Sequence, residues 1–282
     1  MKRALLFILF FAVTGLVGAQ EQPPSPPYYG PGTGNQNPGP GNGNPNYGPA
    51  NENQGGEQGP GVGRISVIRG DLSMQRGDSG DWVATSLNTP VVAGDVLASS
   101  AGSRAEVQLD FADIIRLASQ TQAKIADLSR SHIQIQVSQG NVNLSMFQGG
   151  NAEVEVDTPN VSIRPSKNGR YLIQVNSDSE TNVIVRNGEA EVSTPQGSTT
   201  VAEGEMITIH GTDDPEYKTD PAPGPDDWDT WNLSRDNLIR NNPGVQHTNS
   251  YYTGTQDLDT YGHWVYVPNY GQVWTPNDQP AT

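Results

Sequence analysis

The chain has 282 residues, a formal net charge of −15 and a pI of about 4.5. A protein this acidic repels the phosphate backbone of nucleic acids and anionic membrane surfaces, so neither is an expected partner. The absence of cysteine excludes disulfides, thiolate metal sites and cysteine nucleophiles. Stability must therefore come from burial in a core of reasonable size.

The first segment, residues 1–19, is a predicted secretion signal. Lys2 and Arg3 form its charged start, residues 4–13 are an unbroken apolar run, and small residues precede the cleavage expected after Ala19. The run is too short to span a bilayer, which takes roughly 20 apolar residues. No later segment is apolar enough to span one either. We therefore expect a periplasmic or secreted protein with no membrane span.

Residues 20–61 form a low-complexity tract rich in proline, glycine and asparagine. The tract has almost no aliphatic residue, so it cannot bury enough surface to offset its chain entropy. We expect a disordered, partly extended tether.

Residues 62–211 repeat a period of two. Ile133, Ile135 and Val137, for example, alternate with polar residues, and turn residues recur about every 8–12 positions. The pattern predicts an all-β, largely antiparallel domain, either a sandwich or a short solenoid-like stack of hairpins. Three similar units are each centred on a glycine, at Gly70, Gly140 and Gly188. We expect each to be a hairpin in which glycine supplies a positive φ.

The same region resembles the FecR domain, which is named after the periplasmic part of the iron-dicitrate sensor. The resemblance rests on residues 94–99, 103–118 and 121–125, and on a closing hairpin at residues 194–205. It covers about residues 62–211. It implies an all-β extracytoplasmic module that contacts other components of the bacterial cell envelope.

The best-known FecR proteins relay receptor occupancy through a membrane helix to a cytoplasmic sigma-factor regulator. This chain departs from them, because it carries a cleavable signal and shows no apolar segment for such a helix. The resemblance therefore implies the envelope module without the sigma-regulator relay.

The C-terminal part begins with an acidic, proline-rich hinge at residues 212–225, followed by a helix and an aromatic tail at residues 226–282. Over residues 227–240 we expect a helix whose apolar stripe contains Trp228, Trp231, Leu238 and Ile239. Acidic residues at its start and arginines toward its end suit the helix dipole. The tail at residues 258–276 resembles that of secreted FecR-domain proteins.

Four aromatic residues of the tail are the candidate ligand-binding residues: Trp264, Tyr266, Tyr270 and Trp274. Aromatic rings spaced in this way can stack on sugar rings of a surface polysaccharide. They can equally pack a small satellite core with the helix over residues 227–240, and this interpretation is the favoured one, because large aromatics bury most of their area in folded domains.

No catalytic motif accompanies these residues. The four histidines are far apart in the sequence without the spacing of metal ligands, so we expect no metal site and no cofactor. The sequence favours a non-catalytic interaction module of the cell envelope over an enzyme. The expected partner is an envelope protein, or alternatively a carbohydrate or cell-wall polymer bound by the aromatic tail. The sequence does not determine the oligomeric state.

Overall fold

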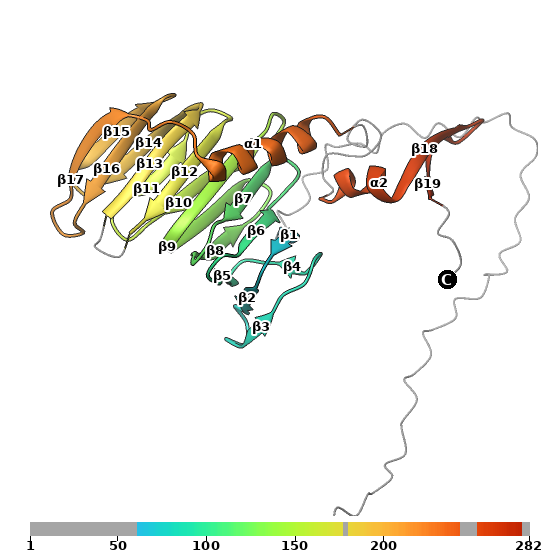
Figure 1. Cartoon of the computed structure of the whole chain (residues 1–282), viewed down its shortest axis with the longest axis horizontal. Helices are drawn as coiled ribbons and strands as arrows, with labels where there is room; N and C mark the ends of the chain where they lie inside the picture. The colour runs from blue at the N-terminus through green and yellow to red at the C-terminus, as the bar shows by residue number, and fades with distance from the viewer. Residues whose placement is uncertain (1–60, 177–179, 243–252, 278–282) are drawn as a thin grey trace, which may run out of the picture. The chain divides into compact units, whose positions relative to one another are not determined.

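The computed structural model describes residues 61–176, 180–242 and 253–277; the predicted signal peptide and almost all of the predicted tether lie outside these ranges. Strands β1 to β17 form one hydrogen-bonded system of 17 strands, which confirms the predicted all-β class (Figure 1). The strands are β1 (Gly63–Arg69), β2 (Leu72–Gln75), β3 (Trp82–Ala84), β4 (Pro90–Val91), β5 (Val96–Ser99), β6 (Arg104–Gln108), β7 (Asp113–Leu117), β8 (Gln122–Leu128), β9 (His132–Met146), β10 (Glu153–Asp157), β11 (Ser162–Pro165), β12 (Arg170–Val175), β13 (Glu180–Asn187), β14 (Glu189–Thr194), β15 (Gly197–Ala202), β16 (Glu205–His210) and β17 (Glu216–Pro221).

The strands are arranged in two layers. The first layer has the order β4-β1-β6-β7-β9-β12-β13-β16-β17, and the second has the order β3-β2-β5-β8-β9-β10-β11-β14-β15. Among the described pairs, only β9 and β10 run parallel. The predicted largely antiparallel arrangement is therefore confirmed.

Strand β9 belongs to both layers. Its first half pairs with β8 and β10 in the second layer, and its second half pairs with β7 and β12 in the first. The crossing lies at Gly140, where φ is +85°. A single 15-residue strand thus joins the two sheets through continuous backbone.

The three glycine units are corners between the layers, and the prediction that they are hairpins is wrong. Gly70 and Gly188 lead from a strand of one layer to a strand of the other, as Gly140 does within β9. No described pairing joins β1 to β2 or β13 to β14. The predicted positive φ is nevertheless present at all three, with values of +78°, +85° and +97°. The left-handed conformation turns the chain out of one sheet and into the other.

The core lies between the layers and consists of the apolar residues that alternate along each strand. Ile133, Ile135 and Val137 are buried as their spacing predicts, together with residues of both layers in one cluster. Burial of one such side chain contributes roughly 1.5–3 kcal/mol, so this cluster supplies the stability that disulfides do not.

The C-terminal part contains α1 (Asp227–Arg240), α2 (Thr255–Tyr261) and a hairpin of β18 (Gly262–Val267) and β19 (Gly271–Pro276). Helix α1 has the bounds expected from the sequence, and Asp226 caps it in a capping box with Asp229. The range 212–225, expected to be a hinge, contains β17, which pairs with β16. The domain boundary at Gly211 stays a prediction. None of the helices in the described ranges has the length and apolar character needed to cross a membrane.

The corner at Gly140 can be tested by replacing it with alanine. A Cβ there would lie 2.5 Å from Thr121 Oγ1 and 2.6 Å from Thr121 Cα, besides straining a left-handed backbone. We expect Gly140→Ala to lower the free energy of unfolding by about 3 kcal/mol or more. Gly204 has a similar φ of +82° but open space around it. Gly204→Ala should cost only about 1–2 kcal/mol. Urea denaturation measures both; equal losses would contradict the crowded corner.

Candidate functional site

Helix α1 packs on the outer face of the first layer with a polar stripe. Its buried residues are Asp229, Asn232, Asp236 and Ile239, which share one side of a helix. The predicted apolar stripe is only partly present: Ile239 is buried, but Leu238 is 61% exposed. Trp228 and Trp231 are half-buried and stack on each other, with ring centroids 5.0 Å apart.

The sheet offers a polar surface to this helix. On β6, β7 and β9, core residues alternate with side chains that face outward and are nonetheless buried. These include Glu106, Arg116 and Ser145, and Figure 1 shows α1 lying across the strands that carry them. Charged groups removed from water in this way must find partners across the interface.

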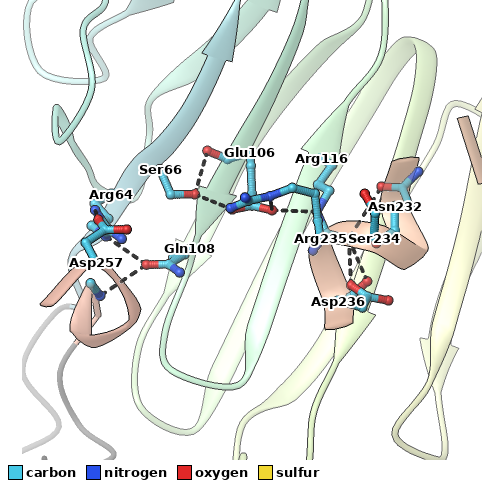
Figure 2. A network of polar contacts seen from close by, with 12 residues as sticks. Arg64, Ser66, Glu106, Gln108, Arg116, Asn232, Ser234, Arg235, Asp236 and Asp257 are labelled. Atoms are coloured by element: carbon cyan, nitrogen blue, oxygen red, sulfur yellow. Dashed lines mark hydrogen bonds and ion pairs between the residues drawn. The ribbon is translucent and has the colours of Figure 1, made fainter. Parts of the chain in front are cut away.

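Arg116 is the centre of this interface and is 0% exposed. Its Nε lies 2.7 Å from Glu106 Oε2, and its Nη1 lies 2.7 Å from Asp236 Oδ1 of α1. Arg235 of α1 adds a second pair, with its Nη2 2.7 Å from Glu106 Oε1. Figure 2 shows Glu106 held between the two arginines and Arg116 held between the two carboxylates. We call these four residues the α1 anchor.

The charge of Glu106 is strongly stabilised in the anchor. Burial alone raises its pKa, but the hydrogen bond from Arg235 and the charges of Arg116 and Arg235 outweigh burial and lower the pKa to about 2. Glu106 is therefore a carboxylate at any physiological pH. It is also 0% exposed, so no substrate can reach it and its role is structural.

A second ion pair fastens the start of α1. Arg186 of β13 donates two hydrogen bonds to Asp229, at 2.8 Å from Nε to Oδ1 and 2.6 Å from Nη2 to Oδ2. The same Asp229 accepts a hydrogen bond from the main chain of Asp226 in the capping box. The helix start is thus fixed to the sheet by the residue that also completes its cap.

The four predicted ligand-binding residues lie together on the β18–β19 hairpin. Trp264 stands opposite Trp274, and Tyr266 stands opposite Gln272, so alternation puts the two tryptophans and Tyr266 on one face. Tyr270 lies in the turn. The structure therefore places all four residues on a single small unit, the β18–β19 hairpin, as expected.

The hairpin divides these residues into two pairs. Trp264 and Trp274 are half-buried, and Trp274 Nε1 donates a hydrogen bond of 3.0 Å to the carbonyl of Leu258 in α2. Tyr266 and Tyr270 are 71% and 81% exposed. The half-buried tryptophans agree with packing in a small core, but the hydrogen bond shown is with α2 and not with the helix at residues 227–240. The rings of the two tyrosines are exposed.

The tail is held to the first layer beside β1 and β6. Arg64 pairs with Asp257 of α2 at 2.7 Å, and it donates a hydrogen bond of 2.7 Å to Gln108 Oε1. The same oxygen accepts a hydrogen bond of 3.1 Å from the main chain of Gly254 (Figure 2). The exposed tyrosines therefore belong to a unit that is tied to the β-domain by specific polar contacts.

Within the described ranges, no three histidine or acidic side chains come together as metal ligands. His132 begins β9, His210 lies 3.2 Å from Glu180, and His263 lies on the hairpin. His247 lies outside the described residues.

The α1 anchor predicts a large effect for a small change. Glu106→Gln keeps the shape of the side chain but leaves two arginines without their shared carboxylate. We expect the free energy of unfolding to fall by about 3–5 kcal/mol. The matched control is Glu155→Gln, since Glu155 pairs with an Arg164 that is 57% exposed; this change should cost about 1 kcal/mol or less. Urea denaturation of both variants decides, and similar losses would argue against a stabilising anchor.

The anchor should also be sensitive to acid. The folded pKa of Glu106 is about 2 against an ordinary 4.5. Its contribution is therefore complete above pH 4.5 and is lost as the pH falls toward 2, a change of about 3 kcal/mol. We expect the difference in unfolding free energy between wild type and Glu106→Gln to shrink over this window. A difference that stays constant from pH 5 to pH 2 would refute the assignment.

Two crystal structures of a putative anti-sigma factor from Parabacteroides distasonis ATCC 8503 are similar to the chain. The first, at 1.65 Å resolution, shares 16% identity over 45% of this chain and 59% of its own, with a TM-score of 0.40. The second, at 2.50 Å, shares 14% identity over 65% of this chain and 99% of its own, with a TM-score of 0.42. The chain thus spans less than two thirds of the first of these structures. No curated protein matches the chain.

The sequence itself matches a known family over the middle of the two-layer domain. The family model described as FecR protein matches residues 95–191, from the start of β5 into β14. This stretch includes β9, the corners at Gly140 and Gly188, and both Glu106 and Arg116. It lies inside the region for which the sequence resembles FecR domains, and the resemblance is confirmed over these residues.

Proposed function

We propose that the chain is a non-catalytic, extracytoplasmic interaction module that binds a protein of the bacterial cell envelope. The observation that carries the proposal is the exposure of Tyr266 and Tyr270 on a hairpin tied to the FecR domain. FecR-like proteins are regulatory rather than enzymatic, which supports a role in binding.

The interface under α1 and the surface of the tail differ in chemistry, and the difference supports a binding role for the tail. The charged side chains between α1 and the sheet form ion pairs with one another inside the molecule, where they stabilise the fold. Tyrosine, by contrast, is enriched at protein interfaces, because its rigid ring supplies apolar area while its hydroxyl group forms hydrogen bonds. Tyr261 and Val273 of the tail are also exposed, Val273 on the face of the hairpin opposite Tyr266.

A second candidate function is binding of a surface polysaccharide or cell-wall polymer by the same tail. Two exposed tyrosine rings on one small unit favour it, since flat rings can lie against the apolar faces of sugars. In both cases the protein acts outside the cytoplasm, a location supported by the predicted signal at residues 1–19. The sigma-regulator relay of the best-known FecR proteins forms no part of the proposal.

Photo-crosslinking in cells separates the two candidates. A photoreactive phenylalanine analogue is placed at Tyr270, and a control is placed at Leu238, which is exposed on α1. We expect a protein adduct from position 270 and none from position 238. An adduct with a wall fragment would establish the carbohydrate alternative instead. Equal labelling from both positions, or no adduct from position 270, would contradict the tail as the binding surface.

The tryptophans give a stability control for this experiment. Tyr266→Ala with Tyr270→Ala should abolish the contact with the partner and change the unfolding free energy by less than about 1 kcal/mol. Trp274→Ala should instead loosen the hairpin by about 2–3 kcal/mol, because it removes a half-buried ring and its hydrogen bond to Leu258. Tryptophan fluorescence and hydrogen exchange measure the loss of stability in the two variants. Equal losses would mean that all four rings are equivalent and would contradict the division.

A further inference from the structure

Strand β17 is the last strand of the first layer and lies at one end of the sandwich (Figure 1). It pairs with β16 on one side, and within the described ranges no strand pairs with it on the other. An edge strand presents main-chain groups that a further strand can use. The register shows which residues of β17 carry these groups.

The free groups belong to the odd-numbered residues of β17. The N–H of Ala222 donates a hydrogen bond of 2.8 Å to the carbonyl of Gly204, which is directly opposite in the register. Bonded and non-bonded pairs alternate along an antiparallel ladder, so the even-numbered residues face β16 and Tyr217 and Thr219 face away from it. No hydrogen bond among the described residues reaches the main chain of Tyr217 or Thr219. Pro221 adds a free carbonyl but, as proline, no N–H.

The side chains of the same residues lie on the inner face of β17. Tyr217 and Thr219 stand opposite Ile209 and Ile207, which belong to the core. Tyr217 is nevertheless 59% exposed, and it borders a hollow of about 160 Å³ that residues of β14 and β15 also line. Thr219 and Pro221 are exposed as well. The inner face of this edge therefore has room for the side chains of an added strand.

The outer face of β17 carries charges of both signs. Lys218 Nζ lies 2.8 Å from Asp220 Oδ1, and the two side chains are 75% and 36% exposed. An ion pair this exposed adds little stability within one chain. An ammonium group has three donors, so a carboxylate from a second strand can join Lys218 without displacing Asp220.

We infer that β17 pairs with β17 of a second copy of this chain, antiparallel and centred on Thr219. Thr219 then stands opposite its own copy, and Tyr217 stands opposite the second copy's Pro221. The N–H groups of Tyr217 and Thr219 in each copy find a carbonyl across the seam, as two-fold symmetry requires. On the outer face, Lys218 of each copy meets Asp220 of the other. On the inner face, each tyrosine ring rests on a proline.

The charges select this register over its neighbours. A pairing centred on Lys218 would set lysine against lysine, and one centred on Asp220 would set aspartate against aspartate. A pairing centred on Tyr217 would set Asp220 against Asp214. Like charges directly opposite one another destabilise a strand pair. Of these registers, the one centred on Thr219 is free of such pairs.

The same residues explain why the partner is a second copy rather than an arbitrary strand. Lysine and proline discourage pairing at a free edge. In the proposed register the carbonyl of Pro221 is the group that is used, and Asp220 of the second copy compensates Lys218. A strand without a suitably placed acidic residue leaves that compensation out. The inference does not rest on the aromatic tail or on the function proposed for it.

Charge reversal tests the register. Lys218→Asp sets aspartate against Asp220 of the second copy, and Asp220→Lys sets lysine against lysine. Each variant alone should dimerise at least about tenfold more weakly than wild type. Mixed together, the two variants again place opposite charges across the seam and should form a heterodimer about as strong as the wild-type dimer. The matched control, Lys167→Asp, reverses an exposed lysine that pairs with Glu189 away from β17, and it should leave association unchanged.

Sedimentation velocity of the purified chain without its predicted signal peptide measures association from about 1 μM to about 1 mM. The salt is about 0.15 M, where charges are screened beyond about 8 Å, so that the net charge of the chain does not mask pairing. We expect the sedimentation coefficient to rise from monomer toward dimer. Amide exchange at Tyr217 and Thr219 should slow at least about tenfold at the highest concentration.

Three results would overturn the inference. The first is a chain that stays monomeric over this range. The second is a dimer that both charge reversals leave intact, because it would form through another surface. The third is a pair of weakened variants that do not recover association when they are mixed, because the charges would then not face each other across the seam.

Discussion

The pairing of buried Arg116 with Glu106 and Asp236 determines how the chain beyond the sandwich is organised. A guanidinium group with no exposed surface needs carboxylates around it, and one of its two comes from a helix about 120 positions later in the sequence. Removing α1 would leave Arg116 and Glu106 on an open sheet with half of their partners gone. The two-layer domain and helix α1 therefore form one structural unit, and the tail beyond the helix is fixed to the same layer.

The two outer faces of the sandwich show why this interface was missed in the sequence. Both faces carry polar side chains between core residues: Glu106 and Arg116 in the first layer, Gln134 and Gln136 in the second. Alternation makes the four residues look equivalent. Only the first pair is buried, because α1 covers it. The one signal in the sequence was Arg116 itself. A charged residue between apolar neighbours in strand β7 indicates a face that another element covers.

Local patterns predicted local structure well. The period of two predicted which side of each strand enters the core, glycine predicted positive φ, and Asp226 with its acidic successors fits the start of α1. What glycine did not reveal was the direction of the chain after the turn. A hairpin and a corner between layers both use a left-handed glycine, and they differ only in which distant strand becomes the neighbour. The tail residues were likewise grouped correctly, but their division into half-buried tryptophans and exposed tyrosines depends on α2.

Strand β9 has a consequence for how the protein is assembled. Each of its halves lies between two partner strands, β8 and β10 in one sheet and β7 and β12 in the other. Neither sheet can therefore be completed without this strand, and damage to one sheet propagates along its backbone to the other. Sandwiches whose sheets meet only through side chains can lose one face before the other. Here the connectivity constrains the order of events during folding. The two sheets must pack against each other and complete their strand pairing together, because they share β9. This favours a single cooperative step over an intermediate with one finished sheet.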